Sequence, residues 1–166
     1  RDLNANGLRE SEEPLLDASG ILTIGGKPFR IGSRTVLEGV PSGVSRASLT
    51  MDRGFERLFS RTTRIETIEV NEMGDTLVAI GFAEKSALSI SFLEEDGDYF
   101  YEVVTLKING VEFQAFGIIE LVGLVFGEQS IELVGLPGGY TCDEPELSVW
   151  LEPGARGEIE VVVRRE

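Results

Sequence analysis

The sequence contains no histidine and a single cysteine, Cys142, among its 166 residues. Without histidine there is no imidazole general base, no Ser-His-Asp arrangement and no imidazole ligand for zinc. One cysteine excludes an internal disulfide, a thiolate zinc cage and a Cys-His nucleophile pair. We expect Cys142 to be a buried thiol, with an intermolecular disulfide as the alternative. These absences favour a protein that is not an enzyme.

Positive charge is also scarce, since the sequence has 15 Lys and Arg but 29 Asp and Glu, and the net charge is −14. A polyanion would be repelled by this chain, so we expect no nucleic acid partner. The one basic cluster consists of Arg53, Arg57, Arg61 and Arg64, interleaved with Phe55, Leu58 and Phe59. We interpret it as a short amphipathic helix with a solvated basic face. Alternatively, the cluster meets an acidic surface on a neighbouring copy of the chain.

Long hydrophobic runs are absent as well. The longest apolar segment, residues 115–126, is interrupted by Glu120 and two glycines, so we expect no membrane span. The sequence starts with Arg1 and not with Met, which we interpret as a processed product or an excised segment. Any signal peptide would then lie upstream.

The first residues follow the spacing of a calcium-binding loop. Oxygen donors occupy loop positions 1, 3, 5, 9 and 12, a backbone carbonyl falls at position 7, and glycine occupies position 6. Gly7 stands where the loop bends sharply and a β-carbon would be strained. The predicted Ca²⁺ ligands are Asp2, Asn4, Asn6, the Leu8 carbonyl, Glu10 and Glu13. The alternative is a polar, acidic and disordered terminus.

The surroundings of this loop differ from those of an EF-hand. Only Arg1 precedes the loop, Pro14 follows its last ligand, and residues 15–20 are too short and turn-rich for an exit helix. No second complete copy of the loop occurs in the sequence. We therefore expect a static calcium-stabilised brace and not a sensor that opens and closes.

The segment Asp2-Leu-Asn4-Ala-Asn6-Gly7-Leu-Arg-Glu10-Ser-Glu-Glu13-Pro resembles the opening motif of the B-type repeats in serine–aspartate-repeat (Sdr) surface proteins. The resemblance covers residues 2–14. It implies an extracellular, calcium-stabilised β-sandwich of the kind that forms stalks between an adhesive head and the cell wall. It also implies that the loop precedes the first core strand.

Two other groups of residues suggest weaker alternatives. Glu94, Glu95, Asp96 and Asp98 surround a predicted turn, where we interpret them as solvated residues and not as catalytic carboxylates or a second calcium site. Trp150 and Tyr140 are candidates for a sugar-stacking platform. We expect Trp150 to be a core residue instead.

The remaining sequence has the two-residue periodicity of strands. Leu88, Ile90 and Phe92 alternate with serines, and residues 98–108 and 111–116 follow after the turn signals Asp96-Gly97 and Asn109-Gly110. This pattern predicts a three-stranded meander. Further predicted strands cover residues 20–24, 27–31, 65–70, 76–82, 118–125, 131–134, 147–151 and 158–163. The last two strands are separated by Pro153-Gly154 and predict a terminal hairpin.

Short strands and a single short helix near residues 55–60 predict an all-β fold, a β-sandwich or jelly roll. We expect residues 1–19 to form the calcium loop and a lead-in arm, and residues 20–166 to form one domain. The predicted function is an extracellular or cell-surface structural domain of a fibre, stalk or self-assembling layer, with other copies or neighbouring domains as partners. The alternatives are a secreted module that binds a polysaccharide or another ligand, and a virion subunit.

Overall fold

The computed structural model describes residues 1–3, 6–7, 10, 12–72 and 75–166, and it divides into two compact units. Unit 1 comprises Arg1–Glu84 and unit 2 comprises Lys85–Glu166. Each unit has its own cluster of buried hydrophobic side chains, and the two clusters share no residue. One domain was predicted for residues 20–166, whereas the structure forms two separate hydrophobic clusters within that range.

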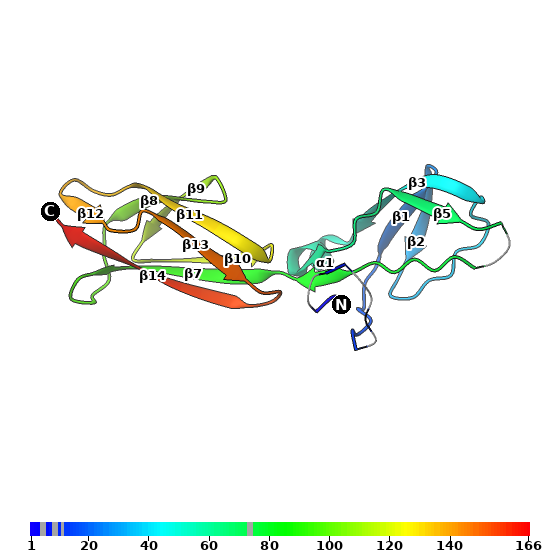
Figure 1. Ribbon diagram of the computed structural model, residues 1–166, viewed down its shortest axis with the longest axis horizontal. Helices are drawn as coiled ribbons and strands as arrows, with labels where there is room; N and C mark the ends of the chain where they lie inside the picture. The colour runs from blue at the N-terminus through cyan, green and yellow to red at the C-terminus, as the bar shows by residue number, and fades with distance from the viewer. Residues whose placement is uncertain (4–5, 8–9, 11, 73–74) are drawn as a thin grey trace. The chain divides into compact units, whose positions relative to one another are not determined.

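Unit 1 contains two small sheets and one helix (Figure 1). Its main sheet has the order β2-β1-β3-β5, and β4 pairs with β6 in a second sheet. The elements are β1 (Gly20–Ile24), β2 (Lys27–Ile31), β3 (Gly43–Met51), α1 (Arg53–Leu58), β4 (Phe59–Arg61), β5 (Thr67–Val70) and β6 (Phe82–Glu84). The core of the main sheet is built around Leu22, Ile24, Ile65 and Ile68.

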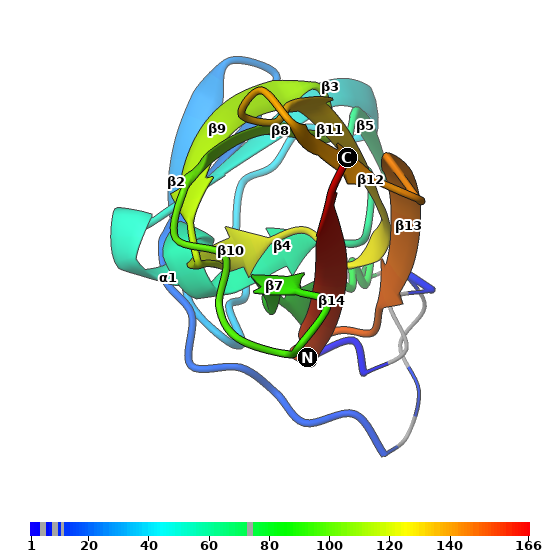
Figure 2. The same ribbon diagram turned by 90° about the vertical axis from the view of Figure 1, so that its left-hand side faces the viewer.

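Unit 2 is one eight-stranded sheet with the order β12-β14-β7-β10-β9-β8-β11-β13. Its strands are β7 (Ser86–Glu94), β8 (Val103–Ile108), β9 (Val111–Phe116), β10 (Ile118–Leu124), β11 (Gly127–Gly135), β12 (Tyr140–Cys142), β13 (Glu146–Leu151) and β14 (Arg156–Arg165). β9 and β10 are joined in the ladder only by the pair Phe116 and Ile118. Within the unit, β8, β9 and β11 lie on the side opposite β7 and β10 (Figures 1 and 2).

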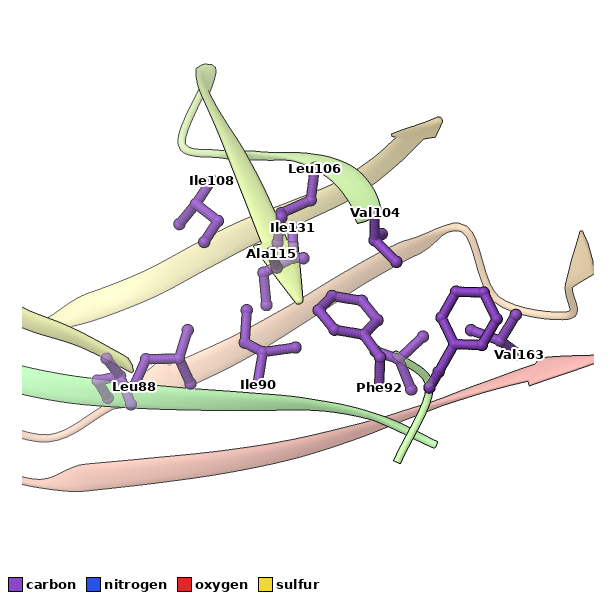
Figure 3. Close-up of a cluster of buried hydrophobic side chains, with 12 residues drawn as sticks. Leu88, Ile90, Phe92, Val104, Leu106, Ile108, Ala115, Ile131 and Val163 are labelled. Carbon is purple, nitrogen blue, oxygen red and sulfur yellow. The ribbon is translucent and has the colours of Figure 1, made fainter. Parts of the chain in front are cut away.

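The core of unit 2 lies between these two sides. Leu88, Ile90 and Phe92 alternate along β7 and are at most 1% exposed. They point toward Leu106 of β8 and Ile131 of β11 (Figure 3). The period of two in the sequence thus produced the buried face that it predicted.

The prediction of an all-β chain with one short helix is confirmed. Helix α1 begins at Arg53, two residues before the predicted start, and has six residues. Within the described part of the chain, no helix is long and apolar enough to cross a membrane.

The predicted meander is wrong in part. β8 and β9 do form a hairpin at Asn109-Gly110, where both residues have positive φ. β7, however, contacts the segment after Asp96-Gly97 through a single bridge between Leu93 and Tyr99. β7 instead pairs with β10 on one side and, in parallel, with β14 on the other.

Two further strand predictions differ from the structure. No hairpin joins β13 to β14, because β13 pairs with β11 while β14 pairs with β7 and β12. Of the predicted strand at residues 76–82 only Phe82 is in a strand, and Leu77 is 95% exposed. The described residues 75–81 pair with no strand. β3 was missed because its inward positions include the small residues Ser45 and Ala47.

Candidate metal site at the N-terminus

Asp2 occupies the first position of the predicted loop and is held against unit 1 by its backbone. Its side chain is 1% exposed, and its N–H donates to the Phe82 carbonyl of β6 at 2.8 Å. The carboxylate accepts hydrogen bonds from the Asn6 N–H at 3.2 Å and the Gly7 N–H at 2.7 Å. These bonds turn both carboxylate oxygens toward the loop backbone.

Glu13, at the last position, mirrors this arrangement. It is 5% exposed, and its two carboxylate oxygens accept the N–H groups of Leu3 at 2.9 Å and Glu10 at 3.0 Å. Asp2 and Glu13 thus close the loop from its two ends. Carboxylates removed from water require such charge-assisted partners, since burial of an uncompensated charge is costly.

Asn6 and Glu10 lie nearer to solvent. Both are exposed, and the Asn6 amide donates to the Glu10 carboxylate at 3.2 Å. Asn4 and Leu8, the two other predicted ligands, lie outside the described residues. Within the described part of the chain, no three Asp, Glu or Cys side chains converge as a ready-made metal site. A carboxylate has about four lone-pair sites. The hydrogen bonds that Asp2 and Glu13 accept from backbone N–H groups therefore do not preclude metal ligation.

The loop is fastened beside β4 and β6 by Thr63 and Gly81, two residues that the sequence did not indicate. The Thr63 hydroxyl donates to the Gly7 carbonyl at 3.1 Å and accepts the Gly81 N–H at 2.9 Å. Gly81 itself has no room for a side chain, because an added β-carbon would lie 2.4 Å from the Thr62 hydroxyl and 3.2 Å from the Asp2 carboxylate. Gly7 has φ +77°, as the position-six glycine requires.

The ends of the loop are tied down as well. The N-terminal amino group donates to the Pro14 carbonyl, and the Arg1 guanidinium pairs with Glu84. Residues 13–19 continue without a helix, as predicted from Pro14 and the short turn-rich segment. The loop is therefore closed on itself and docked on the rest of unit 1, and no helix flanks it among the described residues.

The other candidate sites are not assembled. The acidic residues at 94–98 are all exposed, as expected for a solvated turn, and Glu95 pairs with Arg164 at 3.1 Å. Tyr140 packs edge-on against Phe100 with ring centroids 4.9 Å apart. Trp150 is 66% exposed and not buried as predicted, and its indole N–H donates to Glu152 at 3.0 Å.

No family model matches the sequence, and no curated protein matches it. Among solved structures, the minor pilin GBS52 of Streptococcus agalactiae is similar at 12% identity and a TM-score of 0.49, over 96% of this chain and 88% of that chain. The pilus 2b backbone protein of group B streptococcus is 11% identical with a TM-score of 0.42, over 99% and 83%. The TIE protein of Bacillus anthracis is 13% identical with a TM-score of 0.42, over 99% and 39%. At these values the likeness assigns neither family nor function to the chain.

Proposed function

We propose that this chain is a non-catalytic structural β protein of an extracellular fibre, stalk or self-assembling layer, and that Ca²⁺ stabilises unit 1 through residues 2–13. The observation that carries the calcium proposal is the burial of Asp2 and Glu13 at the two ends of one loop. Both carboxylates are held toward the loop backbone, and the loop is docked on Phe82 of β6 and on Thr63, two residues after β4.

The ligands of the ion would be the six predicted at the outset. Asp2, Asn4, Asn6, Glu10 and Glu13 would offer side-chain oxygens, and Leu8 its backbone carbonyl. The ion would supply positive charge to the carboxylates of Asp2, Glu10 and Glu13, whose like charges repel one another. The stabilisation of the loop would extend to the rest of unit 1, because the Asp2 N–H donates a hydrogen bond to the Phe82 carbonyl of β6.

An extracellular location follows from the same chemistry. A single loop with mixed amide and carboxylate ligands suits a calcium concentration in the millimolar range, which is found outside cells. The two β units in one chain and the absence of histidine from the sequence fit a mechanical role better than a catalytic one.

Thermal unfolding in chelator and in excess Ca²⁺ tests the calcium proposal. Only the folded loop presents its oxygens together, so bound Ca²⁺ should raise the free energy of unfolding by mass action. The expected gain is about 2.7 kcal/mol when free Ca²⁺ exceeds its Kd a hundredfold. Identical unfolding midpoints in chelator and calcium would refute the proposal.

Single substitutions locate the effect in the loop. Asp2→Ala and Glu13→Ala should each abolish the calcium-dependent rise in melting temperature. Glu12→Ala is the matched control, because Glu12 is an exposed carboxylate of the same segment outside the ligand pattern. If Glu12→Ala removed the shift as completely as Glu13→Ala, the effect would be general electrostatics and not a site.

A further inference from the structure

Helix α1 and the strand β4 that follows it carry four exposed basic and apolar side chains, Arg53, Arg57, Leu58 and Arg61, here termed the basic strip. The helix has no buried residue, and Leu58 is 61% exposed. Arg53 and Arg57 are four residues apart and lie on the same helix face. In the described part of the chain, none of the three arginines makes an ion pair.

Aromatic packing holds the helix that carries the strip in place. The Phe55 ring stacks on Phe59 with centroids 4.7 Å apart and meets Phe82 edge-on at 4.9 Å. The short helix is therefore anchored to β4 and β6, while Arg53 and Arg57 are exposed. Such a helix face is preorganised for a partner.

Unit 2 carries a surface of complementary chemistry, here termed the aromatic groove. It has a volume of 540 Å³ and is lined by Tyr101, Glu102, Val103, Thr105, Phe116, Gly135, Leu136 and Pro137. Tyr101 is 63% exposed and Phe116 is 58% exposed, with their ring centroids 5.6 Å apart. Tyr99 extends the set at 6.2 Å from Tyr101. Exposed rings in such a cluster are typical of interaction sites.

The groove lies in the more acidic half of the chain. Unit 1 has ten Lys and Arg against thirteen Asp and Glu, whereas unit 2 has five against sixteen, giving net charges of −3 and −11. Glu102 lines the groove, and the exposed acidic turn at residues 94–98 directly precedes Tyr99. A partner for this surface should thus present positive charge together with apolar side chains.

We propose that the basic strip of one copy docks in the aromatic groove of a second copy. Arginine stacks on tyrosine and pairs with carboxylates, so Arg53 and Arg57 match Tyr101 and Glu102, while Leu58 matches the apolar wall. Because the two surfaces differ, the contact is head-to-tail and can repeat from copy to copy into a filament. This inference rests on the proposed structural role and names the contact by which the subunits assemble.

Charge favours this occupant over the others. The strip belongs to the one cluster of arginines in the sequence, residues 53–64, in which Glu56 is the only acidic residue. The fourth arginine of that cluster, Arg64, lies outside the strip and pairs with Glu66. An anionic polysaccharide would be repelled by the acidic surroundings of the groove, and a neutral glycan would leave the arginines of the strip without a role. A second copy satisfies both surfaces at once.

Two full-length variants test the contact between strip and groove, and each of them has one of the two surfaces inactivated. Arg53→Glu with Arg57→Glu inactivates the strip, and Tyr101→Ala with Glu102→Lys inactivates the groove. Analytical ultracentrifugation in calcium should show concentration-dependent association of the unmodified protein, weakened by added salt. Each variant alone should associate about a hundredfold more weakly. An equimolar mixture of the two should form a dimer and nothing larger, because it contains one intact strip and one intact groove per pair.

The matched control is Arg30→Glu with Arg34→Glu, which changes the charge of unit 1 by the same amount at two exposed positions outside the strip. It should associate like the unmodified protein. A monomer at every concentration, a mixture that stays monomeric, or loss of association in the control would each overturn the proposal. A monomer that bound neutral polysaccharide through Tyr101 would overturn it as well and identify a carbohydrate site. None of these results bears on the calcium-dependent melting, which is measured within one molecule.

Discussion

At the scale of single residues, Gly81 shows how closely the N-terminal loop fits unit 1. Its backbone N–H is bonded to Thr63, and its missing side chain leaves the space that the Thr62 hydroxyl and the Asp2 carboxylate approach. Among the buried side-chain nitrogen and oxygen atoms of the described residues, only the Thr62 hydroxyl has no hydrogen-bond partner. A methyl group at this position would push against three oxygen atoms at once.

Gly81→Ala should therefore lower the free energy of unfolding by about 1–3 kcal/mol, because overpacking displaces the loop or the threonines. It should also reduce the calcium-dependent rise in melting temperature, measured as above. Gly54→Ala is the contrasting control, since its β-carbon would meet no atom within 4 Å and alanine favours the helix. That variant should be more stable by up to about 1 kcal/mol. Equal stability of Gly81→Ala and the unmodified protein would show that the loop is not docked as described.

At the scale of elements, β7 is central to unit 2. It lies between β10 and β14 in the sheet and contributes Leu88, Ile90 and Phe92 to the core. Its parallel pairing with β14 joins residues more than sixty positions apart, from the pair Ala87 and Arg156 onward. The edge strands β12 and β13, by contrast, have one strand neighbour each.

Phe92→Ala should destabilise unit 2 by about 3–5 kcal/mol, because a fully buried ring is replaced by a cavity. Phe116→Ala on β9 removes the same side chain from a position that is 58% exposed, and should cost far less. Chemical denaturation followed by near-ultraviolet circular dichroism measures both. Similar losses for the two variants would contradict the assignment of the core.

At the scale of the whole molecule, the chain is two β units with separate cores. The proposed calcium site, α1 and the basic strip belong to unit 1, while the aromatic groove belongs to unit 2. All three tyrosines and the single tryptophan also lie in unit 2, at positions 99, 101, 140 and 150. Near-ultraviolet circular dichroism in the tyrosine and tryptophan bands therefore reports on unit 2 alone.

Calcium should stabilise only one of the two units. Far-ultraviolet circular dichroism, which follows both units, should show a transition that moves to higher temperature in Ca²⁺. The near-ultraviolet transition should keep its midpoint, because none of the proposed ligands lies in unit 2. If both transitions moved together by the same amount, the two units would unfold as one cooperative structure.

The sequence alone determined the elements whose information is local. The alternation along β7, the Asn109-Gly110 turn and the short helix were predictable because periodicity and turn residues act over a few positions. The ligand spacing from Asp2 to Glu13 is equally local, and calcium binding remains a prediction that rests on it. Strand neighbours were not predictable in the same way, since β7 could pair with any strand that offers a matching face.

Only the tertiary structure decided the long-range arrangement. It placed β14 beside β7, divided the chain at Glu84 and Lys85, and brought Thr63 and Gly81 to a loop some sixty to eighty residues earlier in the chain. It also left Trp150 exposed, because β13 turns that residue away from the core that Leu151 enters. In each case the outcome depends on which surfaces pack together, and no short pattern in the sequence encodes that choice.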